Sequence, residues 1–217
     1  MILYGHPFSS YTWKAAIALD EKGLAHEFRM IGPDQPDHGA ELAAHWPPGK
    51  FPVLVDGGVP VIESSIIIEH LDLHHPGPRL IPADPVEALA VRFMDRSFDN
   101  HVMANAQAVV AEHLPFITPT PDAARIERAK AALDVIYGWL EGKLPDTPWA
   151  CGEGFTLADC AAAPSLFYAD WVHPIAPTFG RLRGYRARLL ARPSVARAVD
   201  GARPYRHFWP LGPIDRD

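Results

Sequence analysis

Hydroxyl groups at two expected helix starts are the residues of this chain best suited to chemistry. Ser9 and Ser10 follow one short apolar run, and Ser64 follows Glu63 after another. A serine at a helix N-terminus sets its hydroxyl beside free backbone N–H groups, where carboxylates and other anions bind well. Each serine can also be a cap that only starts its helix, and the sequence leaves both interpretations open.

The stretch before Glu63 suits an extended peptide with a free carboxylate. Pro52 lies between Phe51 and Val53 at the start of a β-type run. Because proline cannot donate to a ladder, we expect it at the first residue of a strand or on an edge strand. The backbone of Phe51 and Val53 would then be free to pair with a molecule from outside. Lys50 either neutralises a carboxylate of that molecule or is a solvated surface charge.

Other kinds of active site lack the residues that they need. No histidine–acid pair is placed to make Ser9 a nucleophile, and Gly-x-Ser-x-Gly is absent. His70 and His74 have a spacing that can bind zinc, but no third ligand is evident, and a helix dipole favours histidines in its last turn. Cys151 and Cys160 lack the spacing of a zinc site or a structural disulfide. We therefore expect no metal and a reducing, cytoplasmic compartment.

Composition excludes two further classes of partner. The chain has 217 residues, of which 48% are apolar and 21% charged, as is ordinary for a globular protein. Its net charge of −6 opposes non-specific binding to nucleic acid. No uncharged apolar run reaches about 18 residues, the length that a membrane span needs. We expect neither a nucleic-acid nor a membrane partner.

The elements that must position these residues form two groups. Residues 1–76 show β-α-β, then a short helix, then β-β-α, with strands expected at 2–4, 26–31, 51–55 and 59–62. This order predicts a mixed four-stranded α/β sheet with helices packed on it. Residues 77–84 form a proline-rich linker.

Strands disappear after the linker, and the apolar period becomes 3.6. This change predicts an all-α second domain over residues 85–217. Its helices are expected at 85–113, 122–144, 156–171, 179–190 and 193–202, before an irregular aromatic tail. Thr156 to Asp159 has the pattern of a capping box, which is a folding signal and not a binding site.

Four motifs in order resemble the cytosolic glutathione transferases. They are LYGHPFSS at 3–10, PGKFPVL at 48–54, IESSIIIEHL at 62–71 and TLAD at 156–159. The resemblance extends over nearly the whole chain. It implies a thioredoxin-like N-terminal domain that binds glutathione as co-substrate, and a helical domain that supplies a pocket for a hydrophobic electrophile. It also implies a homodimer.

The resemblance assigns roles to the residues around Pro52, whose peptide bond it implies to be cis. The backbone of Val53 would bond the cysteinyl part of glutathione, Glu63 and Ser64 would hold its γ-glutamyl group, and Lys50 would reach its glycine carboxylate. The complete set of expected glutathione-binding residues is Lys50, Phe51, Pro52, Val53, Glu63 and Ser64. His38 is a candidate for a second basic residue near the glycine carboxylate.

The residue that faces the sulfur distinguishes the classes of this family. Ser9 stands at the position used by the serine classes (tau, phi and zeta), and Ser10 is the alternative. Tyr4 lies within a strand and is expected in the core. Tyr11 stands where the zeta class has cysteine, which argues against zeta-type isomerisation. With no cysteine near Ser9, the thiol–disulfide chemistry of the cysteine classes is also disfavoured.

The implied activity is conjugation of glutathione to a hydrophobic electrophile. The Ser9 hydroxyl would donate to the thiolate, and the first helix would add positive potential. The residues expected to line the electrophile pocket are Phe8, Tyr11, His101, Met103 and Trp171. Two alternatives remain: a glutathione-dependent peroxidase or dehalogenase reaction, and a non-catalytic relative that binds ligands or protein partners.

Overall fold

A four-stranded mixed sheet forms the N-terminal part of the molecule, in the computed structural model that describes residues 1–214 and 216–217. Its strands are β1 (Ile2–Gly5), β2 (Glu27–Met30), β3 (Val53–Asp56) and β4 (Val59–Ile62). The strand order is β2-β1-β3-β4. Strand β1 is parallel to β2 and antiparallel to β3, and β4 is antiparallel to β3. The mixed sheet expected from the sequence is confirmed.

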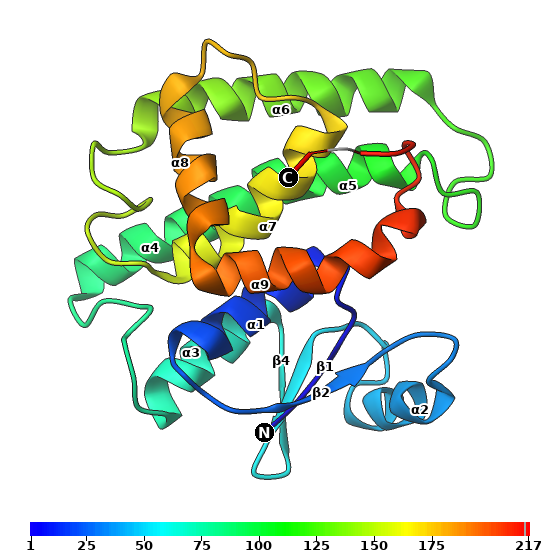
Figure 1. Ribbon diagram of the computed structural model, residues 1–217, viewed down its shortest axis with the longest axis vertical. Coiled ribbons are helices and arrows are strands. Elements are labelled where there is room, and N and C mark those ends of the chain that lie inside the picture. Colours follow the sequence, from blue (N-terminus) through cyan, green and yellow to red (C-terminus); the bar gives the residue numbers. More distant parts are fainter. Residues whose placement is uncertain (215) are drawn as a thin grey trace.

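The two faces of the sheet are covered by different helices. Alternate residues of a strand point to opposite faces. Leu3 and Leu54 therefore belong to the main core with α1 (Ser10–Glu21) and α3 (Ser64–His74). Tyr4 and Val53 pack with Leu42 of α2 (Pro36–His45) in a smaller cluster. Figure 1 shows α1 and α3 between the sheet and the remaining helices, with α2 on the far side.

Strand β3 lies inside the sheet, and the expectation of a free edge at this strand is wrong. Strand β1 covers one side of β3 and the hairpin partner β4 covers the other. Val53 lies opposite both Tyr4 and Ile62. Pro52 directly precedes the strand, and the Phe51–Pro52 peptide bond is cis, as the family resemblance implied. A ligand could therefore reach β3 only at its N-terminal end, next to Pro52, and could not pair along an open edge of the strand.

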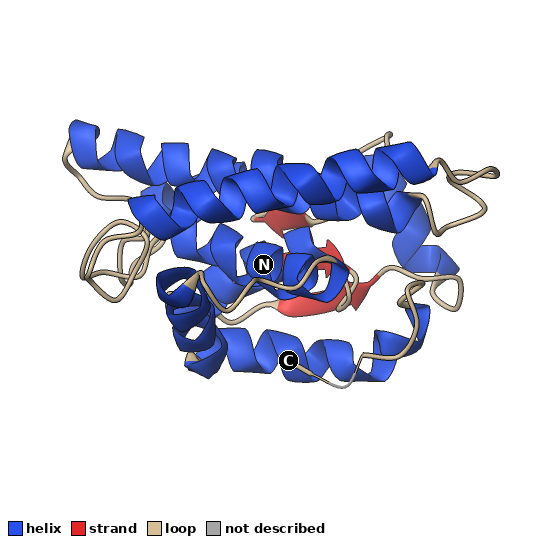
Figure 2. Ribbon diagram, turned by 90° about the horizontal axis from the view of Figure 1, so that it is seen from above, coloured by secondary structure: helices blue, strands red, loops and turns tan. Residues whose placement is uncertain are grey.

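The C-terminal part is helical throughout the residues that the structure describes. Its elements are α4 (Pro85–Ser97), a π-helical turn η1 (Phe98–Met103), α5 (Ala104–Ala111), α6 (Ala123–Lys143), α7 (Leu157–Val172), α8 (Gly180–Ala191), α9 (Pro193–Ala202) and a 3₁₀ segment η2 (Arg203–Phe208). In Figure 2 the strands are visible only in the gaps between helices. The helix expected over 85–113 is thus interrupted by a π turn. Over the described residues, no helix combines the length and the apolar character that crossing a bilayer requires.

A single hydrophobic core joins the two parts. Helix α7 lies at its centre and is buried along almost its whole length. Trp13 of α1 meets Phe167 of α7 at a ring-centroid distance of 4.9 Å. The sheet and the helical part are consequently held against each other by apolar packing and do not simply share a linker.

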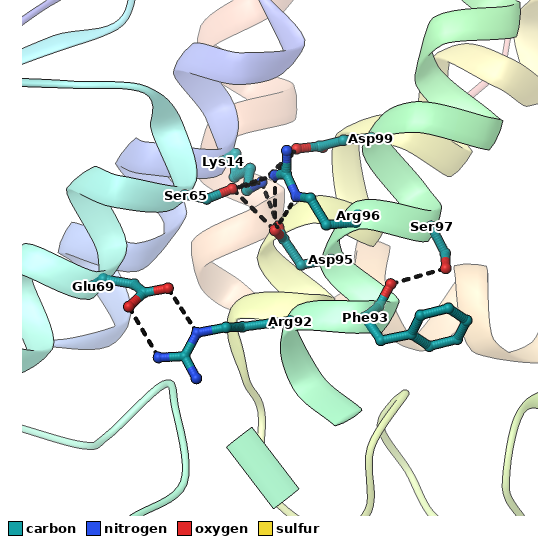
Figure 3. A network of polar contacts seen from close by, with 9 residues as sticks. All are labelled: Lys14, Ser65, Glu69, Arg92, Phe93, Asp95, Arg96, Ser97 and Asp99. Atoms are coloured by element: carbon teal, nitrogen blue, oxygen red, sulfur yellow. Dashed lines mark hydrogen bonds and ion pairs between the residues drawn. The ribbon is translucent and has the colours of Figure 1, made fainter. Parts of the chain in front are cut away.

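A buried polar network also spans this junction (Figure 3). The Lys14 ammonium of α1 is fully buried, and its Nζ lies 2.7 Å from Asp99 Oδ2 and 2.7 Å from Ser65 Oγ. Lys14 also forms an ion pair with Asp95. Arg96 bonds the same two carboxylates from the more exposed side. The network ties α1 and α3 to α4 and η1, and it fixes the start of α3 against the helical part.

Candidate functional site

The turn between β1 and α1 is held from two sides. The Trp13 indole Nε1 donates to the carbonyl oxygen of Pro7 at 2.6 Å. The Tyr168 hydroxyl of α7 donates to the carbonyl oxygen of Phe8 at 2.9 Å. Ser9, the next residue, is therefore presented on a backbone that is positioned by both parts of the molecule, as a preorganised site requires.

Ser9 is the N-cap of α1, and its hydroxyl remains able to donate. The Ser9 backbone is extended, and its Oγ accepts a hydrogen bond from the Thr12 N–H at 3.4 Å. A serine hydroxyl that accepts one bond still has its own hydrogen for another acceptor. The first turn of α1 has no acidic residue, so its positive end is not neutralised there. A thiolate beside Ser9 would be stabilised by a hydrogen bond from this hydroxyl and by the positive end of α1.

An apolar cavity of about 240 Å³ opens beside this turn. It is lined from the start of α1, from η1 with α5 and the residues after it, from α7 and from the C-terminal tail. The lining residues are Phe8, Ser9, Ser10, Met103, Ala106, Gln107, Val110, Leu114, Tyr168, Phe208, Trp209 and Pro210. No lysine, arginine, histidine or acid is among the described lining residues. Such a wall suits an uncharged apolar molecule.

Phe8 and Met103 line this cavity as expected, whereas His101 does not. His101 lies in the π turn two residues before Met103 and faces the other way. It is exposed and lines a separate surface groove with Phe93 and Trp139. Because a π turn holds more residues than an α turn, the face of each side chain could not be counted from a 3.6 period.

Trp171 also lies outside the lining of the apolar cavity. It is almost completely buried and packs against Phe167 and Trp209, with ring-centroid distances of 4.6 and 5.2 Å. Its indole N–H donates to the carbonyl oxygen of Arg216. Trp171 therefore supports Trp209, which lines the cavity, from behind. Trp171 was expected to line the electrophile pocket. It instead packs behind a residue that lines the apolar cavity.

Several lining residues were missed by sequence reasoning. Ala106, Val110 and Leu114 follow the expected Met103 at three- or four-residue spacing, a signal that a core helix gives as well. Tyr168 lies in the middle of a buried helix. The tail residues Phe208, Trp209 and Pro210 were recognised only as an aromatic, irregular segment. These tail residues lie beside the start of α1 because of the tertiary fold, which cannot be inferred from the local sequence.

A second cavity, of about 220 Å³, is polar at its rim. Its lining residues are Tyr11, Trp46, Lys50, Phe51, Pro52, Ile62, Glu63 and Ser64. Five of the six residues expected to bind glutathione therefore lie around one space. The sixth, Val53, has a fully buried side chain and begins β3 directly after Pro52. Tyr11, expected at the electrophile pocket, lies at this cavity instead, because successive helical residues point to different sides.

Glu63 holds the backbone that opens α3 in an unusual conformation. Its φ of 71° is the one positive value of a non-glycine residue in the part of the chain that the structure describes. Such a conformation costs about 1–3 kcal/mol and concentrates at binding sites and ligand clamps. It turns the chain so that the buried Ser64 and the first free N–H groups of α3 lie beside the exposed Glu63 carboxylate.

Comparisons with known proteins identify the family of this chain. A model of the glutathione S-transferase N-terminal domain matches residues 3–79, and one of the glutathione S-transferase C-terminal domain matches residues 101–193. A probable maleylacetoacetate isomerase of Vibrio cholerae is 30% identical over 213 residues, 94% of this chain and 97% of the relative. This chain belongs to the glutathione S-transferase family.

Two further comparisons support the family assignment. A glutathione S-transferase of Pseudomonas putida is 30% identical over 170 residues, 78% of this chain and 75% of the relative. The crystal structure of a glutathione S-transferase from Methylobacillus flagellatus with bound glutathione superposes with a TM-score of 0.79 at 26% identity, covering 91% of this chain and 98% of that one. The family resemblance and the thioredoxin-like and helical fold are thus confirmed.

Within this transferase fold, two other candidates have structural roles. His38 on α2 lies with its Nδ1 2.9 Å from the carbonyl oxygen of Met30 and is not among the lining residues of the polar cavity. Tyr4 is buried in β1 and donates to Glu41 at 2.9 Å. Burial raises the pKa of Tyr4, and the Glu41 hydrogen bond acts in the same direction. Tyr4 is therefore a neutral core residue, as expected.

The linings of the two cavities are adjacent in sequence at the first turn of α1. Ser9 and Ser10 line the apolar cavity, and the next residue, Tyr11, lines the polar one. Burial raises the pKa of Tyr11, and the charge of Asp99 raises it further. Its hydroxyl stays protonated at neutral pH and can only donate or accept a neutral hydrogen bond.

Proposed function

We propose that this protein conjugates glutathione to hydrophobic electrophiles, with the Ser9 hydroxyl as the hydrogen-bond donor to the thiolate. The observation that carries the proposal is that consecutive residues of the first turn of α1 line an apolar and a polar cavity. The polar cavity has charged groups at its rim, and the described lining of the apolar cavity has none. The reacting sulfur would sit between them, beside Ser9.

The polar cavity offers a matching group for each charge of glutathione. The Glu63 carboxylate suits the ammonium of the γ-glutamyl residue, and Ser64 with the N-terminus of α3 suits its carboxylate. Lys50 is exposed at the opposite rim and suits the glycine carboxylate. The backbone around Pro52 and Val53 would hold the cysteinyl part, which directs the thiol towards Ser9.

The reaction needs the glutathione thiol in its thiolate form. The thiol loses its proton to solvent, and the resulting thiolate accepts a hydrogen bond from the Ser9 Oγ–H. The free N–H groups at the start of α1 lower the thiol pKa further, since positive potential favours the anion. The thiolate then forms a C–S bond with the electrophile while the leaving group takes the bonding electron pair.

The second substrate is proposed to be an uncharged, largely aromatic electrophile. Phe8, Tyr168 and Trp209 present aromatic side chains to the apolar cavity, and Met103 supplies an adaptable thioether wall. An ionic group entering this cavity would find no opposite charge among the described lining residues. Its desolvation would therefore cost free energy that no ion pair offsets.

Replacing Ser9 tests the proposal directly. Ser9→Ala removes the proposed donor, and we expect kcat with glutathione and an aryl halide to fall roughly 100-fold, as it does when one donor to a developing oxyanion is removed. The acid limb of the pH–rate profile should also move to higher pH, because the bound thiol loses a group that stabilised its anion. Retention on a glutathione resin should be unchanged.

Ser10→Ala is the matched control, because Ser10 lines the same cavity one residue later. We expect it to keep most of the activity. Loss of activity in Ser10→Ala with an active Ser9→Ala would move the donor to Ser10. Wild-type conjugation by both variants would contradict a serine donor altogether.

Isomerisation is a second candidate, favoured by the relative named as a probable maleylacetoacetate isomerase. It would use the same thiolate, which adds to a cis double bond and leaves after rotation. A maleyl substrate carries carboxylates, however, and the described lining of the apolar cavity has no cation to pair with them. We therefore expect turnover of aryl halides and little of a cis-dicarboxylate; the opposite preference would favour the isomerase.

Two other activities are separated by the same substrate panel. Reduction of an organic hydroperoxide or dehalogenation of an alkyl halide would draw on the same thiolate, and either rate above that with aryl halides would reassign the reaction. Calorimetry with glutathione distinguishes a non-catalytic relative. Failure to bind glutathione would favour a role in binding other ligands or partners.

We also propose that the protein is a homodimer, as is typical of its family. Helices α4 and α6 leave a run of large apolar side chains exposed: Val86, Leu89, Phe93, Val135 and Trp139. Scattered single apolar residues are normal on a surface, but a contiguous group of this size marks an interface.

A further inference from the structure

A compact group of metal-binding side chains lies at the end of β3 away from the polar cavity. Asp56 is the last residue of β3, His70 lies in α3, and His75 is the C-cap residue directly after α3. His70 Nε2 is 2.9 Å and His75 Nε2 is 2.6 Å from the same oxygen, Asp56 Oδ2. In residues 1–214 and 216–217 this is the one cluster of three or more such groups whose ligand atoms all lie within 4.8 Å of one another.

The arrangement is close to what a tetrahedral ion requires. With metal–nitrogen and metal–oxygen distances near 2.0–2.1 Å, the ligand atoms of a tetrahedral zinc site lie about 3.3 Å apart. The two nitrogen–oxygen distances, 2.9 and 2.6 Å, would have to lengthen by roughly half an ångström to admit an ion of this size. Each of the three side chains is about one-fifth exposed, so an ion could enter from solvent and keep water at its remaining position.

We propose that Asp56, His70 and His75 bind a divalent transition-metal ion, with zinc as the best-suited ion. Two imidazole nitrogens and one carboxylate oxygen form a donor set that favours zinc, nickel or copper over magnesium and calcium, which prefer all-oxygen ligands. In the absence of an ion, the two histidines share the carboxylate oxygen as hydrogen-bond partners.

The structure selects a different histidine pair from the one that the sequence suggested. His70 and His74 have the familiar i, i+4 spacing, but His74 is not part of the group, although its ring lies beside that of His70. His75 belongs to the group because the chain leaves the helix there with an extended backbone (φ −125°, ψ 147°). The third ligand, Asp56, is distant in sequence and comes from the neighbouring hairpin.

The bound ion would be a clamp and not a catalyst. It would join the end of β3 to the end of α3, whereas the polar cavity lies at the opposite ends of both elements, at Pro52 and Ser64. The 11 residues of α3 span about 16 Å at a rise of 1.5 Å each. The ion is therefore too far from the proposed thiolate to touch it, and the proposal does not depend on the function of the cavities.

Calorimetric titration with zinc chloride tests the site, using the full chain without a histidine tag. We expect one zinc ion per chain. Asp56→Asn and His75→Ala should each weaken binding by at least about 100-fold, because even changes behind the ligands weaken metal binding about 10- to 100-fold. His74→Ala is the matched control and should bind like the wild type. Cobalt(II) should give visible absorption bands that the first two variants lose.

Thermal unfolding supplies a second readout: the change in Tm that zinc causes in each protein. Because each variant is compared with itself without zinc, its own stability does not affect the result. Zinc at about 100 times its dissociation constant should raise the wild-type Tm by roughly 5–10 °C. It should raise that of Asp56→Asn much less. Glutathione conjugation should be the same with zinc and with chelator. Absence of one-to-one binding up to about 100 µM zinc, or equal binding by wild type, Asp56→Asn and His75→Ala, would overturn the proposal.

Discussion

Ser9 and the two cysteines show how burial decides which side chains of this chain can react. Cys151 is partly buried beside the start of α7, and burial raises the pKa of its thiol to about 12. Cys160 is completely buried within α7, and its thiol pKa is also raised by burial. Neither thiol lines the cavities at Ser9. In the proposed conjugation, the reacting thiol is accordingly that of glutathione and not one of the protein.

We predict that the native protein is insensitive to thiol alkylation. With a pKa of about 12, roughly one Cys151 thiol in 10⁴ is ionised at pH 8, against about a quarter of free cysteines. Iodoacetamide should therefore leave glutathione conjugation unchanged over the time in which free cysteine is fully modified. Mass spectrometry should find both cysteines unmodified in the folded chain and both labelled in urea. Rapid labelling with loss of activity would contradict this assignment.

The residues that bind glutathione in our proposal were predictable because each is set by its neighbours in sequence. Pro52 marks a strand start, and Glu63 with Ser64 marks a helix start, and both signals are local. Asp56 and His75 are brought together only by the fold, and no local sequence pattern indicated their contact. The positive φ of Glu63 is also invisible in its residue type, since that conformation ordinarily selects glycine or asparagine.

At the scale of elements, the capping box of α7 carries more than a helix start. Asp159 is fully buried and accepts hydrogen bonds from the N–H groups of Thr156 and Ala150 and from the hydroxyls of Thr156 and Tyr185. One carboxylate thus fixes the first turn of α7, the loop before it and a residue of α8. Sequence reasoning found the cap but not the two longer-range bonds.

We predict that Asp159→Ala destabilises the protein by about 3 kcal/mol or more. Loss of the cap contributes about 1 kcal/mol, and each donor left buried without a partner adds about 1–3 kcal/mol. Asp122→Ala is the control, because Asp122 is the N-cap of α6 at an exposed position, accepts a hydrogen bond from the Ala124 N–H, and should cost about 1 kcal/mol when replaced. Urea unfolding measures both. Equal losses would mean that the two longer-range bonds contribute nothing.

The π turn explains why helix prediction failed at the wall of the apolar cavity. The sequence over residues 85–113 has continuous helical character and no proline or glycine to break it after Pro85. The extra residue of a π turn changes which side chains face inward without leaving a compositional mark. Phe98, Asp99, Val102 and Met103 are consequently buried, while His101 is turned to the surface. The helical conformation was predictable from the sequence, but which side chains after the π turn face the core was not.

At the scale of the whole molecule, the junction of the two parts depends on one buried cation. Lys14 pairs with Asp95 and Asp99, and all three are almost completely buried. Burial raises the pKa of Asp99, which the neighbouring Lys14 charge opposes. Removing the ammonium would leave two carboxylates with only Arg96 at their exposed side. The orientation of the sheet against the helices, and so the position of the two cavities relative to each other, should depend on this ammonium group.

We predict that Lys14→Met lowers the free energy of unfolding by about 3–5 kcal/mol at pH 7, as breaking a buried ion pair does. Without the Lys14 charge that opposes it, burial would raise the pKa of Asp99 further in the folded state, which then binds protons more strongly than the unfolded chain. The deficit should therefore shrink as the pH falls towards 5. Lys130→Met, which breaks an exposed pair with Glu127, should cost less than about 1 kcal/mol. A pH-independent deficit would contradict the buried-charge explanation.

The exposed apolar residues of α4 and α6 lead to the prediction about assembly. Phe93 and Trp139 meet edge to face at 5.9 Å and, with Val135, line a surface groove of about 480 Å³. A second copy that covered this surface would remove these side chains from water, and sedimentation should then give about twice the chain mass of 23.9 kDa. Phe93→Asp should convert the protein to monomers at micromolar concentration, because the dimer would bury an unpaired charge.

Phe116→Asp is the matched control for this assembly, since Phe116 is even more exposed but lies in the loop between α5 and α6. That variant should sediment like the wild type. The apolar cavity is lined by the start of α1, α7 and the tail of the same chain, as well as by Met103 and α5. A monomeric Phe93→Asp should therefore retain conjugation per chain. Loss of activity on dissociation, with the fold intact by circular dichroism, would instead mean that the partner completes the site.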